Sequence, residues 1–400
     1  MKTYNEKQVE NQDDEVQEMN NYEVAVVGGG MVGAAIALGF ARQGRSVVLV
    51  EGAEPKAFDA AQPMDIRVSA ISETSVALLR ELGAWEDIAA MRVCPYRRLE
   101  TWEHPECRTR FDAESMALEQ LGYIIENRLI QLGLWQQFDQ YDNLTVRCPD
   151  TLRDIEFGAR NRVTLSCGET FDVEWVVGAD GANSRVRQLA GIGVTAWDYR
   201  QHCMLISVET AKPQQDITWQ QFTSAGPRSF LPLCGHQGSL VWYDSPQKIR
   251  QLSALNHDQL REQILTTFPP ELGDVKVQGM GSFPLTRRHA QTYAQCGCVL
   301  VGDSAHTINP LAGQGVNLGF KDVAVLLDVS DGHELEAVLL KRYERRRRPD
   351  NLLMQTGMDV FYKGFSNDLP PLKLLRNAAL KLAEHSGPVK QQVLKYALGM

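Results

Sequence analysis

The chain lacks the features that would place it across a membrane or outside the cell. None of its apolar runs reaches the ~18–20 residues that a membrane-spanning helix needs. Residues 1–22 carry six acidic side chains and no apolar segment, which excludes a secretory signal peptide. We expect residues 1–22 to form a disordered acidic tail. Met19 is a candidate for the true start, because the folded part is predicted to begin at Glu23.

Cysteine also lacks any regular framework. The eight cysteines form no CxxC pair, and only Cys296 and Cys298 are closely spaced. A CxC pattern alone is weak evidence for a metal site. The sequence therefore predicts reduced thiols in a cytoplasmic protein, with no bound metal.

The net charge of −9 is unevenly distributed. Residues 341–400 contain 12 Lys and Arg against 5 Asp and Glu, a surplus of +7 that leaves −16 for the rest of the chain. An acidic body with a basic end argues against nucleic-acid binding. It leaves open the docking of that end onto anionic lipid or an acidic partner.

A predicted helix in this basic end has one apolar face. The members of that face are Leu372, Leu375, Ala379, Leu382 and Ala383, with lysine and glutamate off it. The stripe either packs on its own domain, which we favour, or lies on a bilayer surface.

Local patterns predict an α/β fold interrupted by an antiparallel sheet. A strand over 23–27, a helix over 34–43 and a strand over 47–51 form a βαβ unit. Residues 66–91 and 122–138 have helical spacing, as does the chain beyond 334. From 203 to 280, short strand-like pieces separated by Gly and Pro predict an inserted antiparallel sheet.

The first candidate binding motif is Gly28-x-Gly30-x-x-Gly33, between the first strand and the first helix. Gly28 permits a tight turn, Gly30 lets the backbone approach a pyrophosphate, and Gly33 allows close packing of helix and strand. The helix N-terminus then stabilises the anion. Glu51, at the end of the next strand, is placed to accept hydrogen bonds from ribose hydroxyls. This motif alone does not separate NAD from FAD.

A second such turn lies about 270 residues downstream. Asp303 follows an apolar strand, where a carboxylate can bind the ribityl hydroxyls of a flavin. The turn from Gly313 through Gly315 to Asn317 can aim backbone N–H groups at the isoalloxazine ring. The alternative is a turn with a helix-capping Asp. A cofactor held at both its phosphates and its ring needs two such turns and is most simply FAD.

A third strand ends at Asp180, in a turn that is either functional or simply the capped start of a helix. Taken together, the three turns resemble the signatures of the single-component FAD-dependent aromatic hydroxylases, which have the para-hydroxybenzoate hydroxylase fold. The matching segments are Gly28-x-Gly30-x-x-Gly33, Asp180-Gly181-x-x-Ser184-x-x-Arg187 and Gly302-Asp303-x-Ala305-His306.

Further segments resemble the ubiquinone-biosynthesis branch of that family. They are Asp65-Ile-Arg67-Val-Ser-Ala-Ile-Ser72, Phe283-Pro-Leu-Thr-Arg-Arg-His289 and Asn309-Pro-Leu-Ala-Gly-Gln-Gly-Val-Asn317. Within the branch, segments such as Trp219-Gln-Gln-Phe222 look closest to the members that hydroxylate the demethoxy quinol. The resemblance covers roughly residues 22–400.

The resemblance implies a Rossmann-like FAD-binding domain interleaved with an antiparallel-sheet substrate domain, followed by C-terminal helices. The expected parts are the tail 1–22, the FAD-binding domain 23–95, 123–200 and 281–335, the substrate domain 96–122 and 201–280, and the helical region 336–400.

The implied activity is hydroxylation of a prenylated benzoquinol ring by O2 through a flavin C4a-hydroperoxide, with NAD(P)H as a transient reductant. Glu51 would bind the adenosine ribose, Arg67 would lie near the flavin or its pyrophosphate, and Asp180 would link FAD and nicotinamide handling. No catalytic base is evident. His306 is a weak candidate, because a His after such a turn more often orders the backbone.

Three alternatives stay open. One is a sister hydroxylase that acts on an earlier phenol of the same pathway. Another is a FAD oxidoreductase on the same fold that inserts no oxygen. The last is a scaffold subunit that retains FAD without catalysis. The implied partners are the prenylated quinol, a ubiquinone-biosynthesis complex, and the inner membrane face, reached peripherally through the C-terminal helices.

Overall fold

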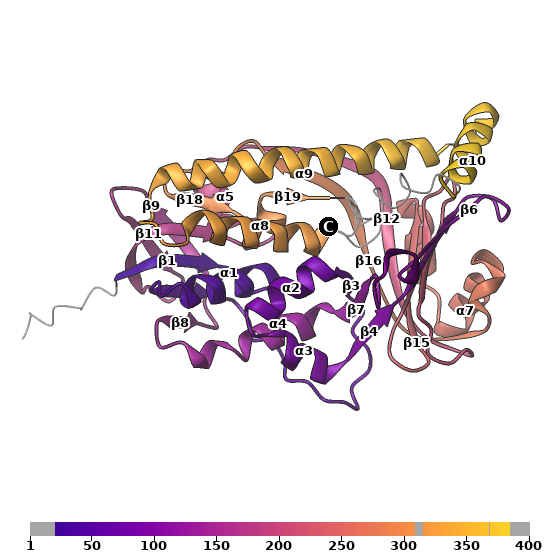
Figure 1. Ribbon diagram of the computed structural model, residues 1–400, viewed down its shortest axis with the longest axis horizontal. Coiled ribbons are helices and arrows are strands. Elements are labelled where there is room, and N and C mark those ends of the chain that lie inside the picture. The colour runs from indigo at the N-terminus through magenta and orange to yellow at the C-terminus, as the bar shows by residue number, and fades with distance from the viewer. Residues whose placement is uncertain (1–20, 309–314, 368, 385–400) are drawn as a thin grey trace, which may run out of the picture.

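Two eight-stranded sheets, joined by a small sheet and flanked by helices, form the frame of the molecule (Figure 1). The computed structural model describes residues 21–308, 315–367 and 369–384. The helices are α1 (Met31–Arg42), α2 (Glu73–Glu81), α3 (Trp85–Met91), α4 (Asn127–Trp135), α5 (Arg185–Leu189), α6 (Pro246–Ser253), α7 (His257–Thr267), α8 (Gly315–Ser330), α9 (Ala337–Phe365) and α10 (Pro370–Glu384). Short 3-10 helices are η1 (Glu114–Met116), η2 (Phe138–Gln140), η3 (Pro270–Leu272) and η4 (Gly302–Ser304).

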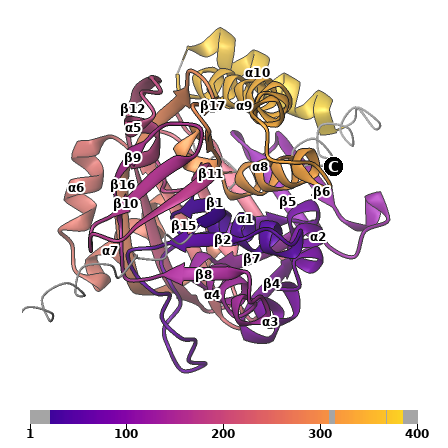
Figure 2. The same cartoon turned by 90° about the vertical axis from the view of Figure 1, so that its left-hand side faces the viewer.

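The first sheet has the order β17-β18-β11-β1-β2-β8, and β10 and β9 extend it by antiparallel pairing from β11. Its strands are β1 (Asn21–Val27), β2 (Val47–Val50), β8 (Leu144–Arg147), β9 (Leu152–Glu156), β10 (Asn161–Leu165), β11 (Thr170–Gly178), β17 (Ala294–Gln295) and β18 (Cys298–Leu300). From β18 to β8 the neighbours are parallel, and Figure 2 shows β8, β2, β1 and β11 one above the other. Val24 and Val26 are fully buried, since helices and strands cover both faces of a parallel sheet.

The second sheet has the order β19-β16-β12-β15-β14-β13-β5-β6 and is largely antiparallel. Its strands are β5 (Arg98–Trp102), β6 (Arg108–Asp112), β12 (Val194–Thr210), β13 (Ile217–Gln221), β14 (Arg228–Pro232), β15 (Gln237–Asp244), β16 (Val275–Ala290) and β19 (His306–Thr307). On one face, Met204, Phe230 and Trp242 pack in a core with residues of α6 and α7. The long strands β12 and β16 run across the domain boundaries predicted at 200 and 280, so that division stays a prediction.

A three-stranded sheet, β3-β7-β4, lies between the two larger ones and corrects two sequence predictions. Its strands are β3 (Val68–Ser72), β4 (Val93–Tyr96) and β7 (Gly122–Glu126). The helical predictions over 66–91 and 122–138 were therefore wrong at their starts, because β3 and β7 pair with each other before α2 and α4 begin. The predicted fold class, α/β with an interleaved antiparallel sheet, is confirmed.

The C-terminal part is helical, as predicted for the described residues. The long helix α9 runs along one side of both large sheets, and α10 packs against β6 at the far end (Figure 1). Within the described part of the chain, no helix combines the length and apolar character needed to cross a bilayer. The predicted stripe on α10 points outward, with Leu375 68% and Leu382 72% exposed, so the favoured packing of that stripe on its own domain was wrong.

Candidate active site

The three turns singled out by the sequence lie side by side at one edge of the first sheet. Because β18, β11, β1 and β2 are parallel neighbours, their carboxyl ends share that edge. The Ala179 amide donates to Val27 O at 2.8 Å, and the Val301 amide donates to Gly178 O at 3.0 Å. Such an edge is where ligands bind in open α/β sheets.

In the first turn, the glycines at 28 and 33 are required by close backbone approach. Gly28 has a φ of +100°, and a Cβ placed there would lie 2.5 Å from Ala179 O. A Cβ on Gly33 would lie 1.8 Å from Gly28 O. Gly30 is different, since in the described part of the chain no neighbouring atom lies within 4 Å of its Cβ position. Its lack of a side chain therefore leaves open space at the start of α1.

The start of α1 is suited to an anion. Gly30 is the N-cap, no side chain caps the helix, and its first turn holds no acidic residue. The first N–H groups of a helix have no partner within the helix and carry its positive dipole end. Gln131 and Trp135, which the sequence did not single out, both donate to Gly29 O at 2.8 Å and brace the turn.

Glu51 lies beside this turn, at the end of β2. Its carboxylate accepts hydrogen bonds from the Gly29 amide and, at 3.1 Å, from the Ala53 amide. Both bonds orient the half-buried carboxylate at the sheet edge.

The second turn packs directly against the first. Cγ atoms of Val32, in the first turn of α1, lie 3.3 Å from the Cβ position of Gly302 and 2.6 Å from that of Gly319 on α8. Side chains at either glycine would push α1 away from η4 and α8. The two glycine-containing segments are therefore built to sit together, although about 270 residues separate them in sequence.

Asp303 occupies η4, with its side chain accessible to solvent. Desolvation by the surrounding protein raises the pKa of Asp303, while the charges of His306, Arg67 and Arg288 oppose that rise. Arg67 is exposed, and its guanidinium lies over the Phe283 ring, 5.6 Å from the centroid.

At the start of α8, Gly315 and Asn317 differ in role. Among residues 21–308, 315–367 and 369–384, no neighbouring atom lies within 4 Å of the Gly315 Cβ position. The buried Asn317 side chain accepts from the Ser72 amide at 3.0 Å and the Ser75 hydroxyl at 2.8 Å, and donates to Ala70 O at 2.8 Å. It ties α8 to β3 and α2, while its backbone N–H stays in the first turn of the helix. Gly313 lies outside the described residues.

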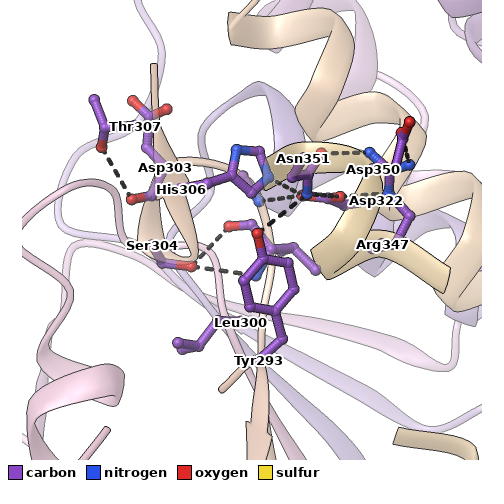
Figure 3. Close-up of polar contacts among 12 residues, drawn as sticks. Tyr293, Leu300, Asp303, Ser304, His306, Thr307, Asp322, Arg347, Asp350 and Asn351 are labelled. Carbon is purple, nitrogen blue, oxygen red and sulfur yellow. Dashed lines mark hydrogen bonds and ion pairs between the residues drawn. The ribbon is translucent and has the colours of Figure 1, made fainter. Parts of the chain in front are cut away.

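His306 belongs to a buried charged cluster behind the second turn (Figure 3). Its Nε2 lies 2.5 Å from Asp322 Oδ2, and the ring is 2% exposed. Asp322 also accepts from Arg347 Nε at 2.7 Å, Asn351 Nδ2 at 3.1 Å and the Gly302 amide at 3.0 Å. We call Asp322, His306, Arg347 and Asn351 the Asp322 cluster. It fixes the turn that carries Asp303, so the geometry favours the backbone-ordering reading of His306 over a catalytic one.

The charge of Asp322 is held by its neighbours. Complete burial would raise its pKa, but His306 and Arg347 outweigh burial and lower the pKa of Asp322 from 3.8 to about 2. The carboxylate therefore stays ionised in the folded protein and accepts bonds from three elements at once.

The third turn is braced by the second. Asp180 Oδ2 accepts from the amides of Arg185 at 2.6 Å and Val186 at 3.1 Å, which caps α5. Its Oδ1 is buried and has no hydrogen-bond partner among the described residues. Arg187, buried at 7% exposure, donates to Ser304 O at 2.7 Å and joins this turn to η4.

An apolar surface of the second sheet lies near this edge. Leu205, Val241 and Phe283 form a cluster with Tyr362 of α9. Ile66, beside Arg67 in sequence, lies 3.0 Å from the Cβ position of Gly279 on β16. We call this the inner face of the second sheet.

The fold and the paired turns define a flavin-dependent monooxygenase, and comparison with known proteins agrees. The sequence matches the family described as FAD binding domain over residues 21–354. The chain belongs to this family, within the FAD-dependent hydroxylases of ubiquinone biosynthesis, as its resemblance predicted.

The individual relatives are as follows. The chain is 52% identical over 385 residues to the 3-demethoxyubiquinol 3-hydroxylase of Escherichia coli (strain K12), covering 94% of this chain and 98% of that protein. It is 34% identical over 391 residues to the ubiquinone hydroxylase UbiL of Rhodospirillum rubrum, covering 94% and 89%. The p-nitrophenol 4-monooxygenase PnpA of Pseudomonas putida DLL-E4 has the same fold, with a TM-score of 0.76, 18% identity and coverage of 94% and 96%.

Proposed function

We propose that this enzyme hydroxylates the ring of the demethoxy quinol, a prenylated benzoquinol of ubiquinone biosynthesis. The observation that carries the proposal is the 52% identity, over nearly the whole of both chains, to a protein named for that reaction. The substrate sheet supports it, because an apolar inner face suits a ring that bears a prenyl tail.

The residues present fit FAD at both ends. The uncapped start of α1 with open space at Gly30 would receive the pyrophosphate, and Glu51 would accept hydrogen bonds from the ribose. Asp303 would bind the ribityl hydroxyls. The first N–H groups of α8, from Gly315 onward, would face the ring, and no described residue crowds the Cβ position of Gly315.

When bound, FAD supplies the two-electron chemistry and the activation of O2, and NAD(P)H is the proposed transient reductant. The chain's own residues orient and shield the reaction. The inner face, with Leu205 and Phe283, would hold the substrate ring within ~3–3.5 Å of the reacting oxygen and exclude water. Arg67, whose charge acts on Asp303 and whose guanidinium lies over the Phe283 ring, would lie between the flavin and this face.

Asp180 is proposed to couple FAD to the nicotinamide. Its buried Oδ1 has no hydrogen-bond partner in the described part of the chain, and such an atom needs a partner to offset its desolvation. The same proposal includes the division of the chain into a FAD-binding domain and a substrate domain. It also includes assembly of the protein with other ubiquinone-biosynthesis proteins.

Two measurements test the function. Cells that lack the protein should accumulate the demethoxy quinone, as mass spectrometry of their quinones would show. Accumulation of an earlier phenol would instead identify a sister hydroxylase. With purified enzyme and 18O2, one labelled oxygen should enter each product molecule. Unlabelled product would identify a FAD oxidoreductase without oxygen insertion.

A further inference from the structure

Exposed apolar side chains gather on the C-terminal helices. Thirteen large hydrophobic side chains are exposed among the described residues, and nine of them lie between residues 352 and 382. The most prominent, which we call the C-terminal apolar surface, are Leu353 (63%), Val360 (67%), Leu372 (44%), Leu374 (75%), Leu375 (68%) and Leu382 (72%). Scattered single hydrophobics are normal on a protein surface, but a gathering of this kind marks a binding surface.

The helix α10 is held to the protein by its polar side. Arg376 and Glu103 form an ion pair with side chains only 8% and 6% exposed. Asn377 Nδ2 donates to Glu103 Oε2 at 2.7 Å, and Thr109 Oγ1 donates to Leu380 O at 3.0 Å. A helix that packs only on its own domain normally turns its apolar stripe inward. Here the polar anchoring, together with the buried Leu380, fixes α10 with Leu372, Leu375 and Leu382 outward.

The exposed charges that the structure describes on residues 352–382 are cationic, while Glu106 is exposed in the turn that anchors α10 and Glu384 ends that helix. Lys363, Lys373 and Lys381 are exposed. The carboxylate of Asp359 is buried and paired with Arg287. The described part of 352–382 therefore presents only positive charge at its surface, on a chain whose net charge is −9. Lysines beside an apolar helix face suit a membrane of anionic lipid.

An aromatic recess joins this surface to the inner face of the second sheet. Phe361 and Phe365 of α9 pack against Phe222, with ring centroids 4.9 and 4.5 Å away. Tyr362, which lines the same recess, belongs to the cluster with Val241 on the inner face. Apolar side chains are thus continuous from the outside of α9 to the proposed substrate surface.

We propose that the C-terminal apolar surface docks onto an anionic lipid bilayer, with α10 lying in the interface. The leucines enter the acyl boundary and the lysines contact lipid headgroups. The choice of a bilayer rests on the cationic surround and on the proposed function, since a prenylated substrate resides in the membrane.

The test is flotation of the full-length holoprotein with vesicles of phosphatidylcholine alone or with about one third phosphatidylglycerol. Flotation is expected with the anionic vesicles. The double variant Leu375→Glu, Leu382→Glu should lower the partition coefficient at least about tenfold. The double variant Lys373→Glu, Lys381→Glu should lower it about fivefold per lysine.

Matched controls are Leu265→Glu on α7, where the leucine is 41% exposed, and Lys276→Glu on β16. Both should float like the unchanged protein, and every variant should hydroxylate a short-tailed soluble quinol at the normal rate. Absence of flotation, equal binding to both vesicles, or equal loss in the controls would overturn the proposal. Light scattering that shows a dimer split by the leucine substitutions would also overturn it, because a second copy of the chain would then cover the C-terminal apolar surface. Stronger flotation after removal of residues 385–400 would overturn it too, because that segment would then cover the surface. Flotation needs no turnover, so a protein that floats but does not hydroxylate the quinol refutes only the proposed function.

Discussion

Replacing Asp322 by Asn tests the Asp322 cluster while nearly preserving side-chain shape. Asp322 is 0% exposed and accepts bonds from His306, Arg347 and the Gly302 amide. The amide cannot balance the buried Arg347 charge, and breaking a buried ion pair costs about 3–5 kcal/mol. With an unfolding entropy of about 2.1 cal/mol/K per residue over the chain, that cost lowers Tm by about 4–6 °C.

The assay is thermal unfolding followed by circular dichroism, with Asp328→Asn as the matched control. Asp328 lies on the same helix and pairs with Arg346 of α9, but its side chain is 65% exposed. An exposed pair contributes only about 0.2–1 kcal/mol, so the control should change Tm by about 1 °C or less. Equal decreases of Tm in Asp322→Asn and Asp328→Asn would refute the reasoning, because burial would then not determine the free energy lost on breaking an ion pair.

Three further predictions concern acid, cofactor and helix anchoring. The folded pKa of Asp322 is about 2, below its ordinary 3.8, so its contribution of about 2 kcal/mol is complete above pH 4 and is lost as pH falls toward 2. Between pH 4 and pH 2 the free energy of unfolding should therefore fall less steeply for Asp322→Asn than for the unchanged protein. Parallel curves of unfolding free energy against pH would contradict this. Asp303→Asn should weaken FAD binding about tenfold in a flavin titration, by loss of a charged hydrogen-bond acceptor, and unchanged affinity would exclude its ribityl role. Arg376→Ala leaves the Glu103 carboxylate buried without its guanidinium, so hydrogen exchange in α10 should accelerate about a hundredfold, and unchanged protection would show that α10 is held otherwise.

The edge that carries the site could be predicted from sequence because it depends on local patterns. Strands β1, β11 and β18 are buried on both faces and read as apolar runs that end at glycine or an acid. Parallel pairing then brings their carboxyl ends together without further information. The positions of Gly28, Asp180 and Asp303 follow from that rule.

The small sheet could not be predicted from such patterns. Strands β3 and β7 pair Ile71 with Tyr123, and each runs directly into a helix. A five-residue strand followed at once by a helix reads as one longer helical pattern, since its partner lies far away in sequence. The two helical predictions failed at their starts because the pairing of β3 with β7 is a tertiary contact, which the composition of either segment does not show.

The Asp322 cluster was missed for the same kind of reason. Residues 345–348 are four consecutive arginines, which the sequence shows only as solvated or paired charges. In the structure only Arg347 of the four is buried, because α9 turns that one position toward Asp322 on α8. Which of four adjacent positions faces inward depends on how α9 is rotated against α8, and no local signal specifies that rotation.

On α10 the helical period was predicted and its orientation was not. Leu372, Leu375 and Leu382 do lie on one face. Glu103, in a turn more than 270 residues earlier, pairs with Arg376, and this pairing leaves that face outward. Asn317 shows the converse case. Its place at the start of α8 was predicted, whereas the hydrogen bonds of its side chain to β3 and α2 were not.

The central claim is that FAD is held at both ends, by the start of α1 and by the start of α8. The most direct measurement is the FAD content and affinity of purified Gly30→Val and Gly315→Val, compared with Gly357→Val on α9. At all three positions no atom of the described residues, apart from chain neighbours and the helix's own backbone, lies within 4 Å of the Cβ site, so the described fold should tolerate each change. Loss of FAD in the first two variants, with full flavin in the third, is the predicted result. Unimpaired FAD binding by either Gly30→Val or Gly315→Val would contradict the claim.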